Sequence, residues 1–295
     1  MKLTGQLNTY SFNPEKDAIQ LTGKFNMAFK GLNQHQQPVL IKLLHPDLSR
    51  NLDSIQQFKN EFELRIDHPN IISAIEYIVH ANQHHIIRPW VDGKDLSKKL
   101  RGHSVIKVIA IVKSVLQALD ALHQQQVLHL DVQPKNIILG TNQQVYLTDL
   151  GLAQKISTYY HRKPFNIYYS APEQILNHTK LYNPSTDLYA VGMLFFELLL
   201  GRKPLNDKHP EILMNLILAA PLINEEVNDL LFDVVKKATS KPRFNLPPSR
   251  LSNQELNDEL MASQQNRYQS ATEFIAALDN LTEEAFKTKS WWKFW

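Results

Sequence analysis

Residues 105–149 constrain the fold more than any other part of this sequence. The stretch VIKVIAIVKSVLQALDALHQQQ, at 105–126, has the broad apolar face of a long amphipathic helix. The short apolar runs VLHL, NIIL and VYLTD follow it, and their lengths are those of β-strands. Polar side chains capable of chemistry stand at the ends of these runs. A long helix followed by short strands indicates a fold of the α+β class.

The sequence before this stretch is typical of a small sheet with one helix. Two apolar runs, at 18–32 and 37–44, are separated by the turn-prone polar segment NQHQQ. Residues 52–66 place apolar side chains three or four positions apart, which predicts an amphipathic helix. Pro69 follows and cannot continue that helix. The runs IISAIEYIV and HHIIRPWV then indicate two more strands.

The remainder of the chain has a mainly helical pattern. Residues 149–173 show little periodicity, and an irregular segment of this length is usually functional or disordered. The next helix is predicted to be capped by Ser185 or Thr186 and to end at Gly201. Its most apolar part, AVGMLFFELLL, contains Glu197 and is shorter than the roughly 20 residues of a membrane span. We therefore expect a buried helix here, and no transmembrane segment.

Composition narrows the class of protein and its partners. The net charge of +3, from 32 basic and 29 acidic residues, is too small to argue for nucleic-acid binding. The absence of cysteine excludes disulfides, thiolate catalysis and cysteine-bound metals, and it fits a reducing compartment. The first residues, MKLTGQLNTY, lack the apolar core of a signal peptide. We therefore expect a cytoplasmic protein that does not bind nucleic acid.

The candidate chemistry begins in the segment HLDVQPKN, at 129–136. Its His, Asp and Asn could simply form turn hydrogen bonds. Asp149, in TDLGLA, is an equally weak signal when it is taken alone. The two segments become specific together, because they occur in this order and each ends a strand pattern. Asn136 and Asp149 also offer the oxygen ligands that Mg²⁺ prefers.

These segments resemble the eukaryotic-type (Hanks-type) serine/threonine protein kinase family, and more specifically a bacterial member of it. The family's catalytic loop reads H-R-D-x-x-x-x-N and its metal loop reads D-F-G. The resemblance covers about residues 17–281. Further matches are Lys42 in VLIK, Glu61 in FKNEFEL, Glu173 in SAPE, Asp187 in DLYAVG and Arg267 in NRYQSATEFIAAL, which the family pairs with that glutamate.

The resemblance implies a single protein kinase domain over residues 1–295, with the bilobal kinase fold. A small β-rich N-lobe with one helix would occupy 1–90, and a larger, mainly helical C-lobe would occupy 91–295. The C-lobe would include the activation segment at 149–173 and an aromatic tail at 287–295. Nucleotide and Mg²⁺ would bind in the cleft between the two lobes.

The same resemblance implies transfer of the γ-phosphoryl group of Mg-ATP to serine or threonine of protein substrates. Asp131 would orient the proton of the attacking hydroxyl, and Lys42, held by Glu61, would contact the α- and β-phosphates. Asn136 and Asp149 would hold the metal. The stretch between Glu61 and HPN is shorter than the family norm, so Glu63 is the alternative partner of the lysine.

Contacts to the nucleotide are also implied residue by residue. The glycine-rich loop aligns as Leu21, Gly23 and Asn26, so one glycine of the family's three remains. Glycines there let the backbone approach phosphates, and this departure predicts weaker or differently shaped ATP binding. The Pro89 carbonyl and the Val91 N–H would contact adenine. Asp95 would reach a ribose hydroxyl.

Several departures bear on activity and its regulation. Leu130 replaces the arginine that commonly pairs with a phosphorylated activation loop, which indicates a kinase that needs no such phosphorylation. Gln133 replaces a lysine that contacts the γ-phosphate, and Lys135 is predicted to reach the same oxygens. This arrangement leaves serine/threonine and tyrosine specificity open. Asn166 stands where a substrate-loop threonine is usual, with a hydrogen bond to Asp131 as one outcome.

Three alternatives remain at this stage. Arg88 could pair with Glu61 in competition with Lys42, which would be autoinhibitory and would suit a pseudokinase that uses the fold as a binding or scaffold module. A small-molecule phosphotransferase shares part of the pattern but generally lacks the APE and DLYAVG segments. The terminal aromatic residues either pack on the large lobe or contact a membrane surface weakly; these residues are Trp291, Trp292, Phe294 and Trp295.

Overall fold

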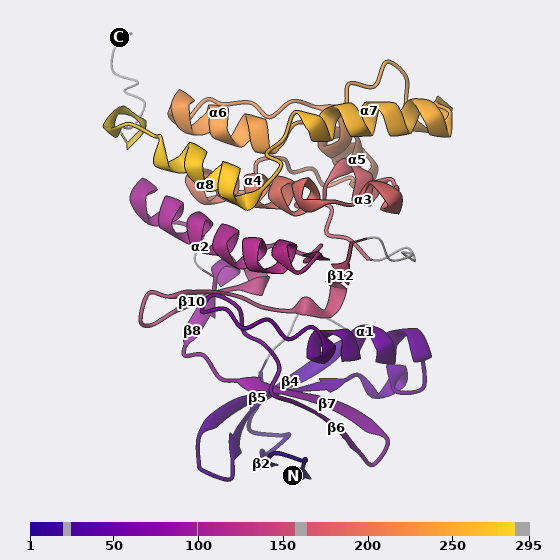
Figure 1. Ribbon diagram of the computed structural model, residues 1–295, viewed down its shortest axis with the longest axis vertical. Coiled ribbons are helices and arrows are strands. Elements are labelled where there is room, and N and C mark those ends of the chain that lie inside the picture. The colour runs from indigo at the N-terminus through magenta and orange to yellow at the C-terminus, as the bar shows by residue number, and fades with distance from the viewer. Residues whose placement is uncertain (20–24, 99, 157–163, 287–295) are drawn as a thin grey trace.

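The computed structural model describes residues 1–19, 25–98, 100–156 and 164–286. A sheet with one helix forms one end of the molecule, and a group of helices forms the other (Figure 1). These are the small β-rich lobe and the large helical lobe. In Figure 1, α2 lies between the small lobe and the remaining helices. Gly23 and the aromatic tail lie outside the described residues.

The small lobe is built on an antiparallel sheet in the order β1-β2-β4-β5-β7-β6, with β3 paired to β4. Its helix is α1, Leu52–Glu63, which begins at the Asn51 cap. Its strands are β1 (Lys2–Thr4), β2 (Thr9–Ser11), β3 (Ala18–Ile19), β4 (Asn26–Asn33), β5 (Pro38–Leu44), β6 (Glu76–His80) and β7 (Gln83–Pro89).

The register of the central strands fixes which side chains meet. Lys42 on β5 lies opposite Ala28 on β4 and Ile86 on β7, and Leu40 lies opposite Arg88. Side chains two residues apart on a strand share a face, so Leu40 and Lys42 point to the same side of the sheet. This register places both cations, Lys42 and Arg88, close to α1.

The sheet is covered on both faces. On one face, Leu44 and Ile86 pack with Phe58 of α1. On the other, the β1–β2 hairpin contributes a cluster in which Leu3 and Tyr10 pack with strand residues such as Ile41. This hairpin precedes the region that resembles the family, and sequence reasoning assigned it no role.

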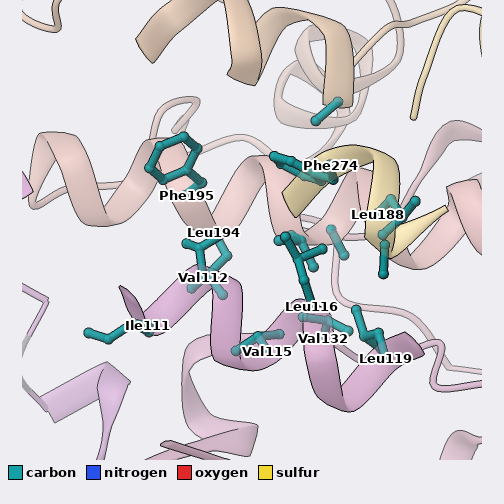
Figure 2. Close-up of a cluster of buried hydrophobic side chains, with 14 of the residues drawn as sticks. Ile111, Val112, Val115, Leu116, Leu119, Val132, Leu188, Leu194, Phe195 and Phe274 are labelled. Atoms are coloured by element: carbon teal, nitrogen blue, oxygen red, sulfur yellow. The ribbon is translucent and has the colours of Figure 1, made fainter. Parts of the chain in front are cut away.

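The large lobe is organised around α2, which crosses it and packs against α4 and α8. Figure 2 shows their side chains meeting in one apolar cluster, with Leu116 of α2, Leu194 of α4 and Phe274 of α8 among them. The helices are α2 (Val105–Gln124), α3 (Pro172–Ile175), α4 (Pro184–Leu200), α5 (Pro210–Ala219), α6 (Asp229–Ala238), α7 (Asn253–Gln265) and α8 (Ala271–Asp279).

Helix α4 is buried along most of its length, as its apolar sequence predicts. It begins earlier than expected, because Asn183 is the cap and Pro184 occupies the first helical position. The prediction of Ser185 or Thr186 as the cap was therefore wrong. Gly201 ends the helix with φ of 65°, a conformation that favours glycine.

Short strands and 3₁₀ turns make up most of the remaining regular structure, and some of them flank the polar loops between the lobes. Strands β8 (Gly93–Asp95), β10 (Ile137–Gly140) and β11 (Val145–Leu147) form one small sheet, and β9 (Val127–Leu128) pairs with β12 (Gln154–Lys155). The 3₁₀ turns are η1 (Pro46–Leu48), η2 (Leu96–Lys98), η3 (Pro134–Asn136), η4 (Leu150–Leu152), η5 (Thr179–Leu181), η6 (Pro248–Arg250) and η7 (Glu283–Phe286). Within the described ranges, no helix combines the length and apolar character needed to cross a membrane.

A buried ion pair joins α3 to the segment that precedes α8. Arg267 Nη1 and Nη2 donate to Glu173 Oε1 and Oε2 at 2.8 and 3.1 Å, and both side chains are fully buried. Thr186 Oγ1 donates to the same carboxylate at 2.9 Å. Burial by itself would raise the pKa of Glu173, but the guanidinium outweighs it and lowers that pKa. The carboxylate therefore remains ionised and depends on Arg267.

We expect Arg267→Met to lower the free energy of unfolding by about 3–5 kcal/mol, because it leaves Glu173 as a buried charge without its partner. The exposed pair Lys237–Glu273, at 2.6 Å, provides a matched control. Lys237→Met should cost less than about 1 kcal/mol. Urea unfolding followed by circular dichroism measures both losses. Similar small losses for the two variants would contradict this prediction.

Candidate functional site

The main cleft of the described chain lies between the lobes and has a volume of about 670 Å³. Apolar side chains of the small lobe, including Ala28 and Leu40, line one wall. The segment 89–91, which joins the lobes, lines a second wall. Polar residues of the loops around β10 and β11 line the floor, and they include Asp131 and Asp149. The cleft therefore has an apolar part and a charged part.

A buried lysine links the small lobe to the floor of the cleft. Lys42 Nζ lies 2.6 Å from Glu61 Oε2 on α1 and 3.3 Å from Asp149 Oδ1. Glu63, the alternative partner, is half-exposed and instead lies 3.5 Å from Lys59 one turn earlier on the helix. The structure thus brings Lys42, Glu61 and Asp149 together, with Glu61 rather than Glu63 at the lysine.

Asp149 stands at the end of β11 in a left-handed conformation, with φ of 69°. Aspartate tolerates this region better than most residues, because its short side chain can hydrogen-bond locally. Burial by itself would raise the pKa of Asp149, yet the Lys42 and Arg88 cations outweigh it and lower that pKa to about 2. The turn η4 that follows packs against α1. The cleft therefore holds an ionised carboxylate at a fixed position.

Arg88 adds a second buried cation to this cluster. Its Nη1 lies 3.7 Å from Glu61 Oε1, whereas Lys42 contacts the other oxygen of the same carboxylate. Nη1 is buried and has no hydrogen-bond partner among the described residues. Arg88 and Lys42 thus share Glu61, and the arginine does not displace the lysine. Two cations face the two carboxylates of Glu61 and Asp149.

The loop that contains Asp131 is held by a carboxylate from α4. Asp187 Oδ2 accepts from the backbone N–H of His129 at 2.9 Å, and Oδ1 accepts from that of Leu130 at 2.8 Å. The ring Nε2 of His123, at the end of α2, donates to Oδ2 at 2.9 Å. Sequence reasoning missed His123, because a histidine near the end of a helix carries no signal of its distant partner.

Leu130 is buried in an apolar cluster with Leu128 and Tyr182, against which Ile156 packs. Its φ of 61° lies in the left-handed region, which costs a leucine roughly 1–2 kcal/mol. The bond from its N–H to Asp187 and the apolar burial of its side chain offset that cost. The position that holds arginine in the family is thus apolar here, and it lies in one cluster with Ile156 of the segment 149–173.

Both carboxylate oxygens of Asp131 accept hydrogen bonds from amide side chains. Asn136 Nδ2 donates to Oδ2 at 2.8 Å, and Gln133 Nε2 donates to Oδ1. Burial raises the pKa of Asp131, and the charge of Lys135 opposes that effect. Lys135 itself is exposed at the rim of the cleft. Asn166 contacts Gln133 and not Asp131, with 2.6 Å between Nδ2 and Oε1.

Most of the other residues predicted to contact the nucleotide line the cleft. Asn26, Pro89 and Val91 line the cleft, as does Asp95. The Asp95 carboxylate, however, accepts from the N–H and the hydroxyl of Ser97 and so caps the turn that follows. A ribose hydroxyl would share this carboxylate with Ser97. Gly23, the remaining glycine of the aligned loop, lies outside the described residues.

The donor set in the charged part of the cleft fits a hard divalent cation. Asp149 supplies an ionised carboxylate. The amide nitrogen of Asn136 donates to Asp131, so its carbonyl oxygen remains as the acceptor for a ligand. Mg²⁺ is usually held by one or two such protein oxygens together with the phosphates of a substrate. Lys42 and Arg88 supply the positive charge that a polyphosphate requires.

Comparison with known proteins agrees with this arrangement. The family model of the protein kinase domain matches residues 22–277. The serine/threonine-protein kinase PrkC of Bacillus subtilis is 27% identical over 70% of this chain and 34% of its own length. A probable serine/threonine-protein kinase of Clostridium perfringens is 25% identical over 91% of this chain and 38% of its own. PkaB of Streptomyces coelicolor, a serine/threonine-protein kinase, is 30% identical over 76% and 56%.

The chain spans less than two thirds of the length of each of these bacterial relatives. The region matched by the family model nevertheless contains most of both lobes and the charged residues of the cleft described above. The order of Lys42, Glu61, Asp131, Asn136 and Asp149 along the chain is the order of the family's motifs. With these residues gathered around one cleft, the chain belongs to the protein kinase family.

Proposed function

We propose that this chain transfers the γ-phosphoryl group of Mg-ATP to serine or threonine residues of protein substrates. The observation that carries the proposal is the position of Lys42, buried between Glu61 at 2.6 Å and Asp149 at 3.3 Å. A buried lysine held by two carboxylates is arranged to meet an anion that enters the cleft. The names of the bacterial relatives support serine/threonine specificity.

Each residue has a role that follows from its surroundings. Lys42 binds phosphate oxygens, and Glu61 keeps its ammonium group in place. Asp131 accepts or orients the proton of the attacking hydroxyl, with its carboxylate held by Asn136. The Pro89 carbonyl and Val91 N–H orient the base at the apolar wall. Bound ATP would supply the phosphoryl group. Mg²⁺, held by Asn136 and Asp149, would neutralise the charge of the phosphates.

The proposal includes a cytoplasmic location, supported by the absence of cysteine from the sequence. Its macromolecular partners are protein substrates, and nucleic acid has no part in it. The weak membrane contact suggested by Trp291, Trp292, Phe294 and Trp295 remains a prediction from the sequence, because these residues lie outside the described part of the chain.

A second candidate function is a pseudokinase that binds nucleotide without transferring phosphate. The observation that favours it is Arg88, whose guanidinium lies 3.7 Å from the same carboxylate that holds Lys42. Against it stand Lys42, Asp131, Asn136 and Asp149, which together retain the means of phosphate binding and proton transfer. The two functions differ in turnover, so an assay separates them.

The decisive assay for transfer compares the chain with its Asp131→Asn variant, which keeps the shape of the side chain but removes the proton acceptor. With labelled Mg-ATP and a generic basic protein, we expect incorporation to fall by about 100-fold or more in the variant. Mass spectrometry should locate phosphate on serine or threonine. Asp258→Asn, at an exposed position on α7, is the matched control and should transfer normally.

Three results would each contradict a part of the proposal. Incorporation that survives unchanged in Asp131→Asn would remove the proposed role of that residue. Absence of incorporation in the unmodified chain, with nucleotide still raising its melting temperature, would favour the pseudokinase. Phosphate found on tyrosine alone would keep the enzyme and overturn the serine/threonine assignment.

A separate prediction concerns Arg88. Because Arg88 adds positive charge to the cleft without displacing Lys42, we expect Arg88→Met to weaken nucleotide binding by about tenfold, equivalent to about 1.4 kcal/mol. If it competes with Lys42, the same change should tighten binding. Titration with a fluorescent ATP analogue measures the dissociation constant. Lys236→Met is the control, because this exposed cation lies on α6, outside the lining of the cleft, and its loss should change affinity by less than about twofold.

A further inference from the structure

The β1–β2 hairpin lies outside the part of the chain that matches the protein kinase family. It ends at Ser11, whereas the family model begins to match at residue 22. The hairpin lies at the end of the small lobe that faces away from the large lobe (Figure 1). Strand β2 pairs with β4, and β1 contacts β6, the outer strand on the opposite side of the sheet. The sheet therefore curls until its two outer strands meet, and the hairpin closes it.

A buried carboxylate on β6 holds the hairpin in place. Glu76 is 4% exposed, and both of its oxygens accept hydrogen bonds from the hairpin. Tyr10 Oη donates to Oε2 at 2.8 Å, and the backbone N–H of Leu7 donates to Oε1 at 2.9 Å. Burial and the nearby carboxylate raise the pKa of Tyr10, so its hydroxyl keeps the proton that it donates. The hairpin must therefore stay docked on the sheet for this buried carboxylate to be satisfied.

Gly5 lets the turn of the hairpin come close to this carboxylate. A Cβ atom at position 5 would overlap Glu76 Oε1 and would lie 2.6 Å from Oε2, a separation that side chains do not reach. Glycine has no Cβ and leaves this space free. A larger residue would push the carboxylate away from its two donors. The turn of the hairpin and the buried residue on β6 are thus fitted to each other.

The docked hairpin packs behind the strand positions next to Lys42 and Arg88. Tyr10 lies in one buried cluster with Ile41 of β5 and Ile87 of β7, which are cross-strand partners. Lys42 and Arg88 are the next residues on these two strands. Successive side chains of a strand point to opposite faces, so the cations face the cleft while the isoleucines face the hairpin. The hairpin therefore supports the two strand positions from which the cations project.

We propose that the β1–β2 hairpin, held in place by Glu76, positions Lys42 and Arg88 for the phosphates of the nucleotide. The inference rests on the proposed function. Glu76 is a positioning residue and not a catalytic one, because it lies opposite Ile87 on the face of the sheet away from the cleft. Undocking the hairpin exposes that face to water and removes the support behind β5 and β7. The two cations then lose their fixed positions.

Loss of this support should affect nucleotide binding more than phosphoryl transfer. Molecules with an undocked hairpin bind nucleotide weakly, so the apparent dissociation constant rises as the docked fraction falls. Asp131 lies in the large lobe, and Asp187 holds its loop independently of the hairpin. A chain saturated with Mg-ATP should therefore transfer phosphate at nearly its usual rate. An increase in the KM for ATP with little change in kcat is the signature of this role.

The test disturbs the buried carboxylate in two independent ways. Tyr10→Phe keeps the ring in the cluster but leaves one oxygen of Glu76 without its donor, which favours the undocked hairpin. Adding Glu76→Met removes the buried charge, and the mostly exposed Leu7 can give its N–H to water, so docking should recover. Gly5→Ala displaces the same carboxylate from the turn. Tyr146→Phe is the matched control, because its hydroxyl also donates to a side chain, outside the lining of the cleft.

Titration with a fluorescent ATP analogue should show that Tyr10→Phe and Gly5→Ala each raise the dissociation constant by about tenfold. The KM for ATP should rise to a similar extent, with kcat within about twofold of its usual value. The double variant Tyr10→Phe/Glu76→Met should bind within about threefold of the unmodified chain, and Tyr146→Phe should leave binding unchanged. Hydrogen exchange followed by mass spectrometry should accelerate in β5 and β7 of the single variants. Unchanged protection of α2 and α4 establishes that each variant is folded.

The proposal is overturned if both folded single variants bind nucleotide as tightly as the unmodified chain. It is also overturned if the hairpin exchanges faster while β5 and β7 stay protected, or if the double variant binds no better than Tyr10→Phe. The binding and exchange measurements need no turnover. An unmodified chain that transfers no phosphate, with single variants that loosen β5 and β7 and weaken binding, would remove the proposed function and leave the role of the hairpin standing.

Discussion

The carboxylate of Asp187 is the contact on which the site depends. It stands on α4, which is buried along most of its length, and accepts from the backbone of His129 and Leu130 and from the ring of His123. A buried carboxylate is costly unless such donors surround it. The loop presents two of these donors, the N–H groups of His129 and Leu130, with Leu130 in a left-handed conformation. The need to satisfy one buried charge thus fixes the backbone just before Asp131.

This anchoring explains why the position after His129 tolerates leucine. The side chain of Leu130 packs with Leu128 and Tyr182, and Ile156 of the segment 149–173 packs on the same cluster. Apolar packing needs no charged partner, so it holds the start of that segment whether or not a phosphate is present. This is the physical basis for our sequence-based hypothesis that activity needs no loop phosphorylation, which stays a prediction.

The sequence predicted those parts of the site that lie in local patterns. Lys42 lies within the apolar strand β5, and Asp131 follows the short strand β9. The apolar runs predicted these strands, and the resemblance to the family's motifs singled out the two residues. The contact of Asn166 with Gln133 joins two irregular loops, and no spacing records it. The β1–β2 hairpin was missed for a similar reason. Its three-residue strands have too little periodicity to predict, and their role appears only when Leu3 and Tyr10 cover the sheet.

The two aspartates on the floor of the cleft, Asp149 and Asp131, have different electrostatic surroundings. Near Asp149, the cations Lys42 and Arg88 face the carboxylates of Glu61 and Asp149, and their charge keeps Asp149 ionised. Around Asp131, neutral amides satisfy the carboxylate, and burial raises its pKa. A metal ligand must hold its negative charge, whereas a proton acceptor works best when its affinity for a proton is increased. The cations beside Asp149 and the burial of Asp131 therefore shift the pKa values of these two aspartates in opposite directions, as their proposed roles require.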